Sequence, residues 1–135
     1  MMSDEIRVGM KISAEQPVTS ELAAAHIGSG SLQVYATPAM VTFVEHTCRK
    51  LIEPLLPPGQ TTVGTLIELE HLAPTPVGGT VHIDASVTEV DGRRVVFAAE
   101  IRDEEELVGR ARHERFIIDE KRFLQRVEDK ASGSR

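Results

Sequence analysis

Three polar residues near the middle of the chain have side chains that can perform acid–base chemistry: Thr37, Glu45 and His71. A carboxylate can act as a general base or as a nucleophile, and an imidazole can move a proton near neutral pH. A hydroxyl at a helix N-terminus can help to stabilise a developing oxyanion. The three residue types therefore predict a reactive site, provided that the fold brings them together.

Each of these residues also has a purely structural explanation. Thr37 precedes Pro38 at the start of a helical pattern, so its hydroxyl can serve as the N-cap of that helix. A lone histidine such as His71 is commonly satisfied by a backbone carbonyl at the edge of a core. Glu45 can point along its helix to water or pair with an arginine. Taken singly, the residues leave both interpretations open.

A long helix is predicted within residues 37–54, TPAMVTFVEHTCRKLIEP, with Pro38 at its first helical position and Pro54 at its end. Two adjacent apolar rows at helical spacing indicate a wide buried face. Glu45 interrupts one of these rows, and burial without a partner would raise its pKa toward the range of a working base. Cys48 on the same row is predicted to pack rather than to react, because no basic residue stands beside it.

A strand is predicted over residues 61–72, TTVGTLIELEHL, and it carries both Gly64 and His71. Simple alternation places His71 on one face with Val63 and Ile67, and Gly64 on the other face. Gly64 is expected to mark a bulge or a close strand contact, or to let a substrate carbonyl approach the backbone.

The remaining segments predict an α+β fold. Residues 81–88, 95–101 and 107–118 alternate as three successive strands, the first two joined by an Asp-Gly hairpin turn. Tight connections require antiparallel pairing, so we expect a curved antiparallel sheet packed on the long helix. Its exposed edges favour a homodimer or a higher homo-oligomer.

Shorter elements complete the predicted domain. They are a strand over residues 6–13, a helical run over residues 21–26, and a terminal helix that Asp119 caps and that ends near residue 128. We expect a single domain over residues 1–129, followed by a flexible tail over residues 130–135.

Helix geometry separates two of the candidate residues. With a rise of about 1.5 Å per residue, Thr37 and Glu45 lie roughly 12 Å apart along a straight helix. Either Thr37 belongs to a loop that folds back, or the site combines residues of two subunits. We favour a site at a dimer interface.

Four segments resemble those of the hot-dog-fold thioesterases, and most of all the fluoroacetyl-CoA thioesterase group: VYATPAMVTFVEHTC, VGTLIELEHLAPTPVG, VDGRRV and GRARHER. The spacing of Thr37, Glu45 and His71 matches the catalytic set of that family, and Gly64 matches a glycine beside its substrate carbonyl. The resemblance implies a sheet wrapped around one long central helix. It also implies hydrolysis of a small acyl-CoA thioester, with no cofactor beyond the CoA of the substrate.

One segment departs from the pattern of the family. The fluoroacetyl-CoA enzymes close their pocket with phenylalanines just before the long helix, whereas HIGSGSLQ, residues 26–33, has no aromatic residue. The resemblance therefore implies thioester hydrolysis and does not extend to fluoroacetate discrimination. Two rival functions stay open: a hot-dog hydratase or dehydratase for enoyl or hydroxyacyl thioesters, and a non-catalytic acyl-CoA-binding protein.

The composition limits the expected partners. A net charge of −6, from 15 basic and 21 acidic residues, disfavours nucleic acid. The five histidines lie on separate predicted elements, so no metal site is expected. Late arginines are expected either to balance nearby glutamates or to hold the phosphates of CoA; they are Arg93, Arg94, Arg110, Arg112 and Arg115.

The expected location is the cytoplasm. No apolar run is long enough to cross a membrane, and the first residues do not have the pattern of a secretory signal. Cys48 is the single cysteine, which fits a reducing compartment.

Overall fold

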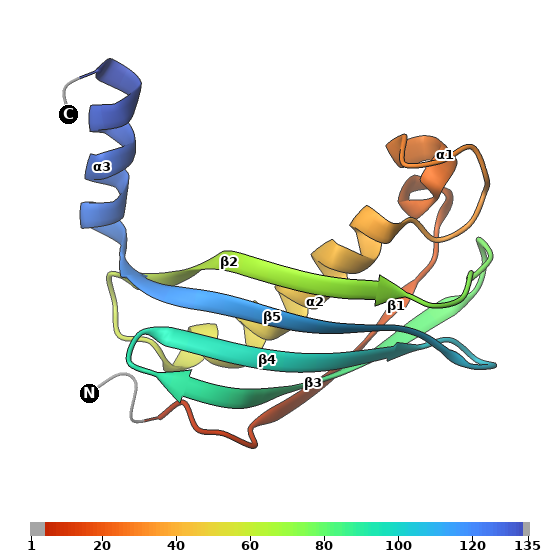
Figure 1. Cartoon of the computed structure of the whole chain (residues 1–135), viewed down its shortest axis with the longest axis horizontal. Coiled ribbons are helices and arrows are strands. Elements are labelled where there is room, and N and C mark those ends of the chain that lie inside the picture. Colours follow the sequence, from red (N-terminus) through yellow and green to blue (C-terminus); the bar gives the residue numbers. More distant parts are fainter. Residues whose placement is uncertain (1–4, 134–135) are drawn as a thin grey trace.

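The computed structural model describes residues 5–133 and centres on helix α2 (Thr37–Ile52), which lies against one face of a five-stranded antiparallel sheet (Figure 1). The strands are β1 (Lys11–Pro17), β2 (Gln60–His71), β3 (Thr80–Asp91), β4 (Arg94–Arg102) and β5 (Leu107–Asp119). They lie in the order β1-β3-β4-β5-β2, so that β1 and β2 form the two edges. The predicted α+β arrangement is confirmed.

Helix α2 begins at Thr37, one residue before the predicted first helical position, and it ends before Pro54 as predicted. Pro38 is its second residue, where a missing N–H costs no helical bond. The 3₁₀ turn η3 (Glu53–Leu55), which contains Pro54, follows its last residue. Its apolar face and the inward residues of β3 and β4 form the core; among them are Met40, Phe43, Val44, Ile83, Val87, Phe97 and Ile101. This broad contact fixes the helix against the sheet.

Strand β2 contains a bulge that alternation did not reveal. Its pairing with β5 shifts between Gly64 and Leu66, which makes Thr65 the extra residue. One inserted residue exchanges the two faces for the rest of the strand. Gly64 and His71 therefore lie on the same face, the one that packs against α2. The prediction that they lie on opposite faces is wrong, because it assumes that side chains alternate strictly between the two faces, and an inserted residue breaks this alternation.

The N-terminal elements differ from their predicted bounds, and β1 continues to Pro17, past the predicted end at residue 13. Strand β1 begins at Lys11 and not at residue 6, because Gly9 adopts a φ of 97° and interrupts the extended chain. The predicted helical run is split into the 3₁₀ turn η2 (Ser20–Leu22) and the single turn α1 (Ala24–Ile27). Gly28 ends α1 with a φ of 93°.

The C-terminal helix α3 (Glu120–Ser132) is longer than predicted. As predicted, Asp119 caps it, since its carboxylate accepts a hydrogen bond from the Arg122 N–H at 3.3 Å. The helix continues past residue 128, so that residues 130–132 of the expected tail are helical. The expected tail also includes residues 134–135, which lie outside the described residues, as do residues 1–4 of the expected domain.

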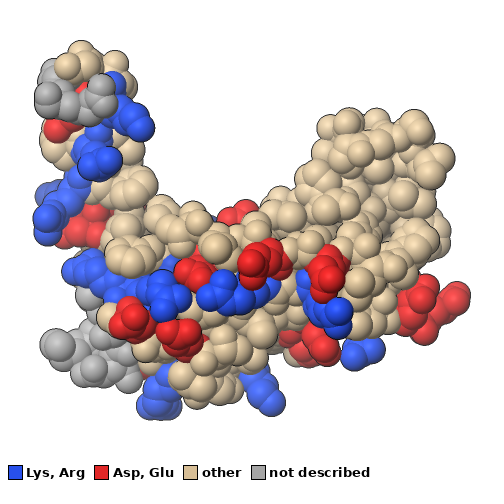
Figure 2. Space-filling view, in the orientation of Figure 1, with Lys and Arg blue, Asp and Glu red and all other residues tan. Residues whose placement is uncertain are grey.

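Two projections rise beyond the β2 edge of the sheet. Helix α3 stands at one end of β2, and α1 with its following loop stands at the other end (Figure 1). The surface between them is hollowed over β2 (Figure 2). Helix α3 buries none of its described residues and exposes Phe123, Leu124 and Val127. Within residues 5–133, no helix is both long and apolar enough to cross a membrane.

Candidate active site

Thr37 and His71 meet at the N-terminus of α2. Thr37 is the first residue of the helix, and Ala36 takes the N-cap position, so the predicted N-cap role of Thr37 is wrong. Its hydroxyl instead reaches β2, where Thr37 Oγ1 lies 2.8 Å from His71 Nδ1. The first turn of α2 can approach the sheet this closely because Gly109 on β5 has no side chain where the sulfur of Met40 packs.

The imidazole of His71 is held in a partly buried position. The Tyr35 ring meets it edge-on, with ring centroids 6.3 Å apart. Nε2 is shielded from solvent and has no hydrogen-bond partner among residues 5–133. Burial lowers the pKa of His71, and the nearby backbone of Ala73 opposes this shift. A neutral imidazole in contact with a hydroxyl can accept its proton or return one.

Glu45 lies further along α2, against Gly64. A Cβ built at Gly64 would come within 2.6 Å of Glu45 Oε2, so the missing side chain is what allows the carboxylate to approach the β2 backbone. The side chain of Glu45 is 42% exposed. This differs from the expected burial, since residues 5–133 leave a large part of the Glu45 side chain open to solvent.

Arg115 is a buried cation beside Glu45. Its side chain is 7% exposed, and Nη1 lies 3.8 Å from Glu45 Oε2. Nε donates to Thr62 Oγ1 at 2.8 Å, and Nη2 donates to the Thr62 carbonyl at 3.2 Å. Burial lowers the pKa of Arg115, whereas the Glu45 carboxylate raises it.

The buried position of Arg115 was not predicted. Together with the other late arginines, it was expected either to balance nearby glutamates or to hold the phosphates of CoA. Alternation along β5 could have separated it, because residue 115 shares a face with Ala111, His113 and Ile117, all of which turn toward α2. An arginine on an otherwise inward face indicates a buried partner.

The candidate residues thus form two clusters within one chain. Thr37 and His71 lie at the start of α2, and Glu45, Gly64 and Arg115 lie at a point about 12 Å further along its axis. Because Thr37 is part of the helix, the alternative of a loop that folds back is wrong.

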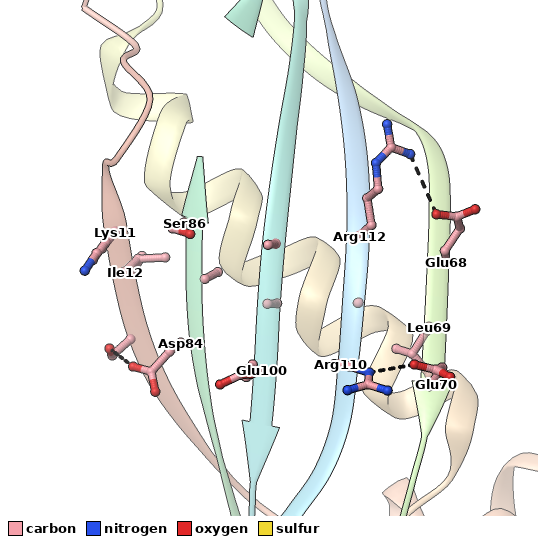
Figure 3. A pocket seen from close by; sticks show the side chains of 15 residues that line it. Lys11, Ile12, Glu68, Leu69, Glu70, Asp84, Ser86, Glu100, Arg110 and Arg112 are labelled. Atoms are coloured by element: carbon pink, nitrogen blue, oxygen red, sulfur yellow. Dashed lines mark hydrogen bonds and ion pairs between the residues drawn. The ribbon is translucent and has the colours of Figure 1, made fainter. Parts of the chain in front are cut away.

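A hollow of about 990 Å³ lies on the face of the sheet that points away from α2 (Figure 3). None of the candidate catalytic residues lines it. Its arginines pair with glutamates, Arg110 with Glu70 at 2.6 Å and Arg112 with Glu68 at 3.8 Å. These pairs support the expectation that most of the late arginines balance neighbouring acids.

Among residues 5–133, no group of three or more histidine, cysteine or acidic side chains could hold a metal ion.

Comparisons with known proteins agree with this architecture. The family model described as fluoroacetyl-CoA-specific thioesterase matches residues 18–121. The fluoroacetyl-CoA thioesterase of Streptantibioticus cattleyicolor is 32% identical over an alignment 135 positions long, which covers 96% of this chain and 97% of that protein. A solved structure of a fluoroacetyl-CoA thioesterase superposes with a TM-score of 0.87 at 31% identity, covering 94% of this chain and 98% of that one.

The fold itself recurs at lower identity. A hot-dog-like protein from Thermanaerovibrio acidaminovorans superposes with a TM-score of 0.89 at 22% identity, covering 96% of each chain. The five-stranded sheet on one long helix is therefore a hot-dog fold. The chain belongs to the fluoroacetyl-CoA-specific thioesterase family and is a thioesterase.

Proposed function

We propose that this thioesterase hydrolyses a small acyl-CoA thioester to a free acid and CoA. The observation that carries the proposal is the hydrogen bond of 2.8 Å between Thr37 and His71 at the start of α2. The fluoroacetyl-CoA relatives support CoA as the thiol part of the substrate. The reaction needs no cofactor beyond that CoA.

The N-terminus of α2 is where we propose that the thioester carbonyl binds. The first N–H groups of a helix point outward and carry a partial positive charge, which stabilises an oxyanion. Thr37 adds a hydroxyl at the same end. Gly64 lets the thioester approach the β2 backbone beside the Glu45 carboxylate.

In the first version of the chemical step, Glu45 takes a proton from water while the water oxygen attacks the carbonyl carbon. The tetrahedral intermediate then collapses, the C–S bond breaks, and the proton that Glu45 took from water passes through His71 to the leaving thiolate. In a second version, Glu45 attacks the carbonyl carbon, the C–S bond breaks with loss of the CoA thiolate, and water hydrolyses the mixed anhydride that results.

In a third version, Thr37 attacks the carbonyl carbon while His71 takes its proton. The C–S bond breaks, the protonated His71 gives that proton to the leaving thiolate, and water hydrolyses the resulting ester. The Thr37–His71 hydrogen bond specifically supports the third version.

A homodimer is the second part of the proposal. The outer side of β2 pairs with no other strand of residues 5–133, and α3 exposes apolar residues beside it. Antiparallel pairing of two β2 strands about a two-fold axis would set the Gln60 end of one chain beside the His71 end of the other. This arrangement would bring the Glu45 cluster of one subunit toward the Thr37 cluster of its partner.

The buried single cysteine supports a reducing, cytoplasmic location.

The test is release of free CoA from acetyl-, propionyl- and fluoroacetyl-CoA, followed with a thiol reagent. We expect turnover by the wild type, and a loss on the order of 100-fold or more in Glu45→Gln. Glu105→Gln is the matched control, because Glu105 is exposed in the β4–β5 turn. Full turnover by Glu45→Gln would contradict every version that uses this carboxylate. Mass spectrometry of quenched enzyme locates any acyl group on Thr37 or on Glu45.

A further inference from the structure

His113 is a buried titratable residue that the proposed mechanism does not use. It lies on β5 two residues before Arg115, on the same inward face, and is 1% exposed. The Phe97 ring stacks on it, with centroids 6.1 Å apart and an interplanar angle of 28°. The plane of the imidazole is therefore fixed by packing.

The two ring nitrogens of His113 have partners that define its protonation. Nδ1 lies 2.7 Å from the Leu66 carbonyl, which can only accept, so Nδ1 carries a hydrogen. Nε2 lies 3.2 Å from Arg115 Nη1, which can only donate, so Nε2 is unprotonated. The two contacts together require the neutral imidazole with its hydrogen on Nδ1.

This imidazole connects two parts of the candidate site. Leu66 directly follows the β2 bulge that turns Gly64 toward α2, and a bulge leaves the local ladder incomplete. By donating to the Leu66 carbonyl, His113 ties the bulge to β5. By accepting from Arg115, it orients the guanidinium that faces the Glu45 carboxylate at 3.8 Å.

The charged groups around the ring act on its protonation in opposite directions, since Arg115 favours the neutral ring and the two glutamates favour the protonated one. Arg115 on β5 is in direct contact with it, Glu45 approaches from α2, and Glu114 lies next to it in the chain. A protonated His113 would point an N–H at the Arg115 guanidinium, which has no acceptor atom. The net effect lowers the pKa of His113: burial, the main cause, and Arg115 lower it, whereas the Leu66 hydrogen bond, Glu45 and Glu114 oppose the shift.

We propose that His113 is a positioning residue for thioester hydrolysis, which links the bulge carbonyl of Leu66 to Arg115 and so holds Gly64 and the Glu45 carboxylate at their working separation. The proposal rests on the proposed function of Glu45. It assigns no contact between His113 and the substrate.

Two substitutions separate the hydrogen bonds of His113 from its packing. His113→Phe keeps an aromatic ring against Phe97 and removes both ring nitrogens. His113→Gln keeps one amide that can donate and one oxygen that can accept. We expect kcat to fall on the order of 10- to 100-fold in the Phe variant with KM changed less than about threefold, and to recover in part in the Gln variant. Ile83→Val, a core change on β3, should leave kcat of the folded enzyme unchanged.

A double-mutant cycle tests whether His113 acts through Glu45. In a Glu45→Gln background, His113→Phe should cause less than about a twofold further loss, because the group that it positions is already disabled. A wild-type kcat in folded His113→Phe, or full additivity of the two losses, would overturn the proposal.

Nitrogen-15 NMR of the histidine rings gives a readout that is independent of turnover. At pH 7 we expect His113 to be neutral with its proton on Nδ1, and the Arg115 guanidinium N–H groups to exchange slowly in wild type and quickly in His113→Phe. A proton on Nε2, or unchanged Arg115 exchange in the variant, would overturn the positioning role. Failure of wild-type CoA release would instead contradict the proposed function, and it would leave these NMR expectations unaltered.

Discussion

At the N-terminus of α2, one hydroxyl and one imidazole share a hydrogen bond, and the protonation of the ring decides which of them can act as a base. His71 can accept the proton of Thr37 only while it is neutral. Burial lowers its pKa below the ordinary histidine value of 6.5. The lowered pKa favours the neutral ring, so the base form persists to a lower pH than it would in a free histidine.

The pH dependence of kcat/KM follows from this shift. We expect a plateau above pH 6.5 and a fall on the acid side whose midpoint lies below 6.5, because His71 must be neutral to take a proton. His71→Asn should lose roughly 10²- to 10⁴-fold in kcat. The control is His82→Gln, since His82 on β3 is partly exposed and pairs with Glu15 at 3.3 Å, with no part in the proposed chemistry. An acid limb centred above pH 7 would contradict this role of His71.

At the scale of elements, the sequence predicted the helices and strands whose apolar residues recur at a regular spacing. The apolar rows of α2 and the alternation of β3 and β4 arise from helix and strand geometry, so each could be identified without knowledge of its partner. The bulge at Thr65 depends on how β2 pairs with β5, and no local pattern encodes that pairing. Alternation along β5 indicates that Arg115 faces inward, but its partners cannot be read from that pattern, since Thr62, His113 and Glu45 surround it only after folding.

Two glycines on neighbouring strands should respond differently to alanine. At Gly64, the new Cβ meets the end of the flexible Glu45 side chain at 2.6 Å, so the carboxylate can move aside. We expect kcat/KM to fall on the order of tenfold or more, with a change in stability below about 1 kcal/mol. At Gly109, the Cβ overlaps the sulfur of Met40 in the core, and overpacking should cost about 1–3 kcal/mol. Urea unfolding and steady-state kinetics measure both effects; equal loss of stability at the two sites would contradict this assignment.

At the scale of the whole molecule, the fold divides the candidate residues between two clusters and leaves the outer side of β2 without a partner strand among residues 5–133. Glu45 is more exposed than the buried helix pattern around it predicts, and its carboxylate lies beside Gly64 of β2, an edge strand of the sheet. The hollow between α1 and α3 lies over that edge (Figure 2). A second copy seated there would cover Glu45, exclude water from it and supply the other cluster.

Mixed dimers test the division of the site. Thr37→Ala and Glu45→Ala should each be nearly inactive as homodimers. Equal mixing with subunit exchange gives about half heterodimers, in which one site carries both substitutions and the other carries neither, so roughly a quarter of wild-type activity should return. Native mass spectrometry confirms that heterodimers are present, and mixing either variant with itself is the control. If heterodimers form and no activity returns, Thr37 and Glu45 act within one chain, and the pairing of clusters across the β2 edge is wrong.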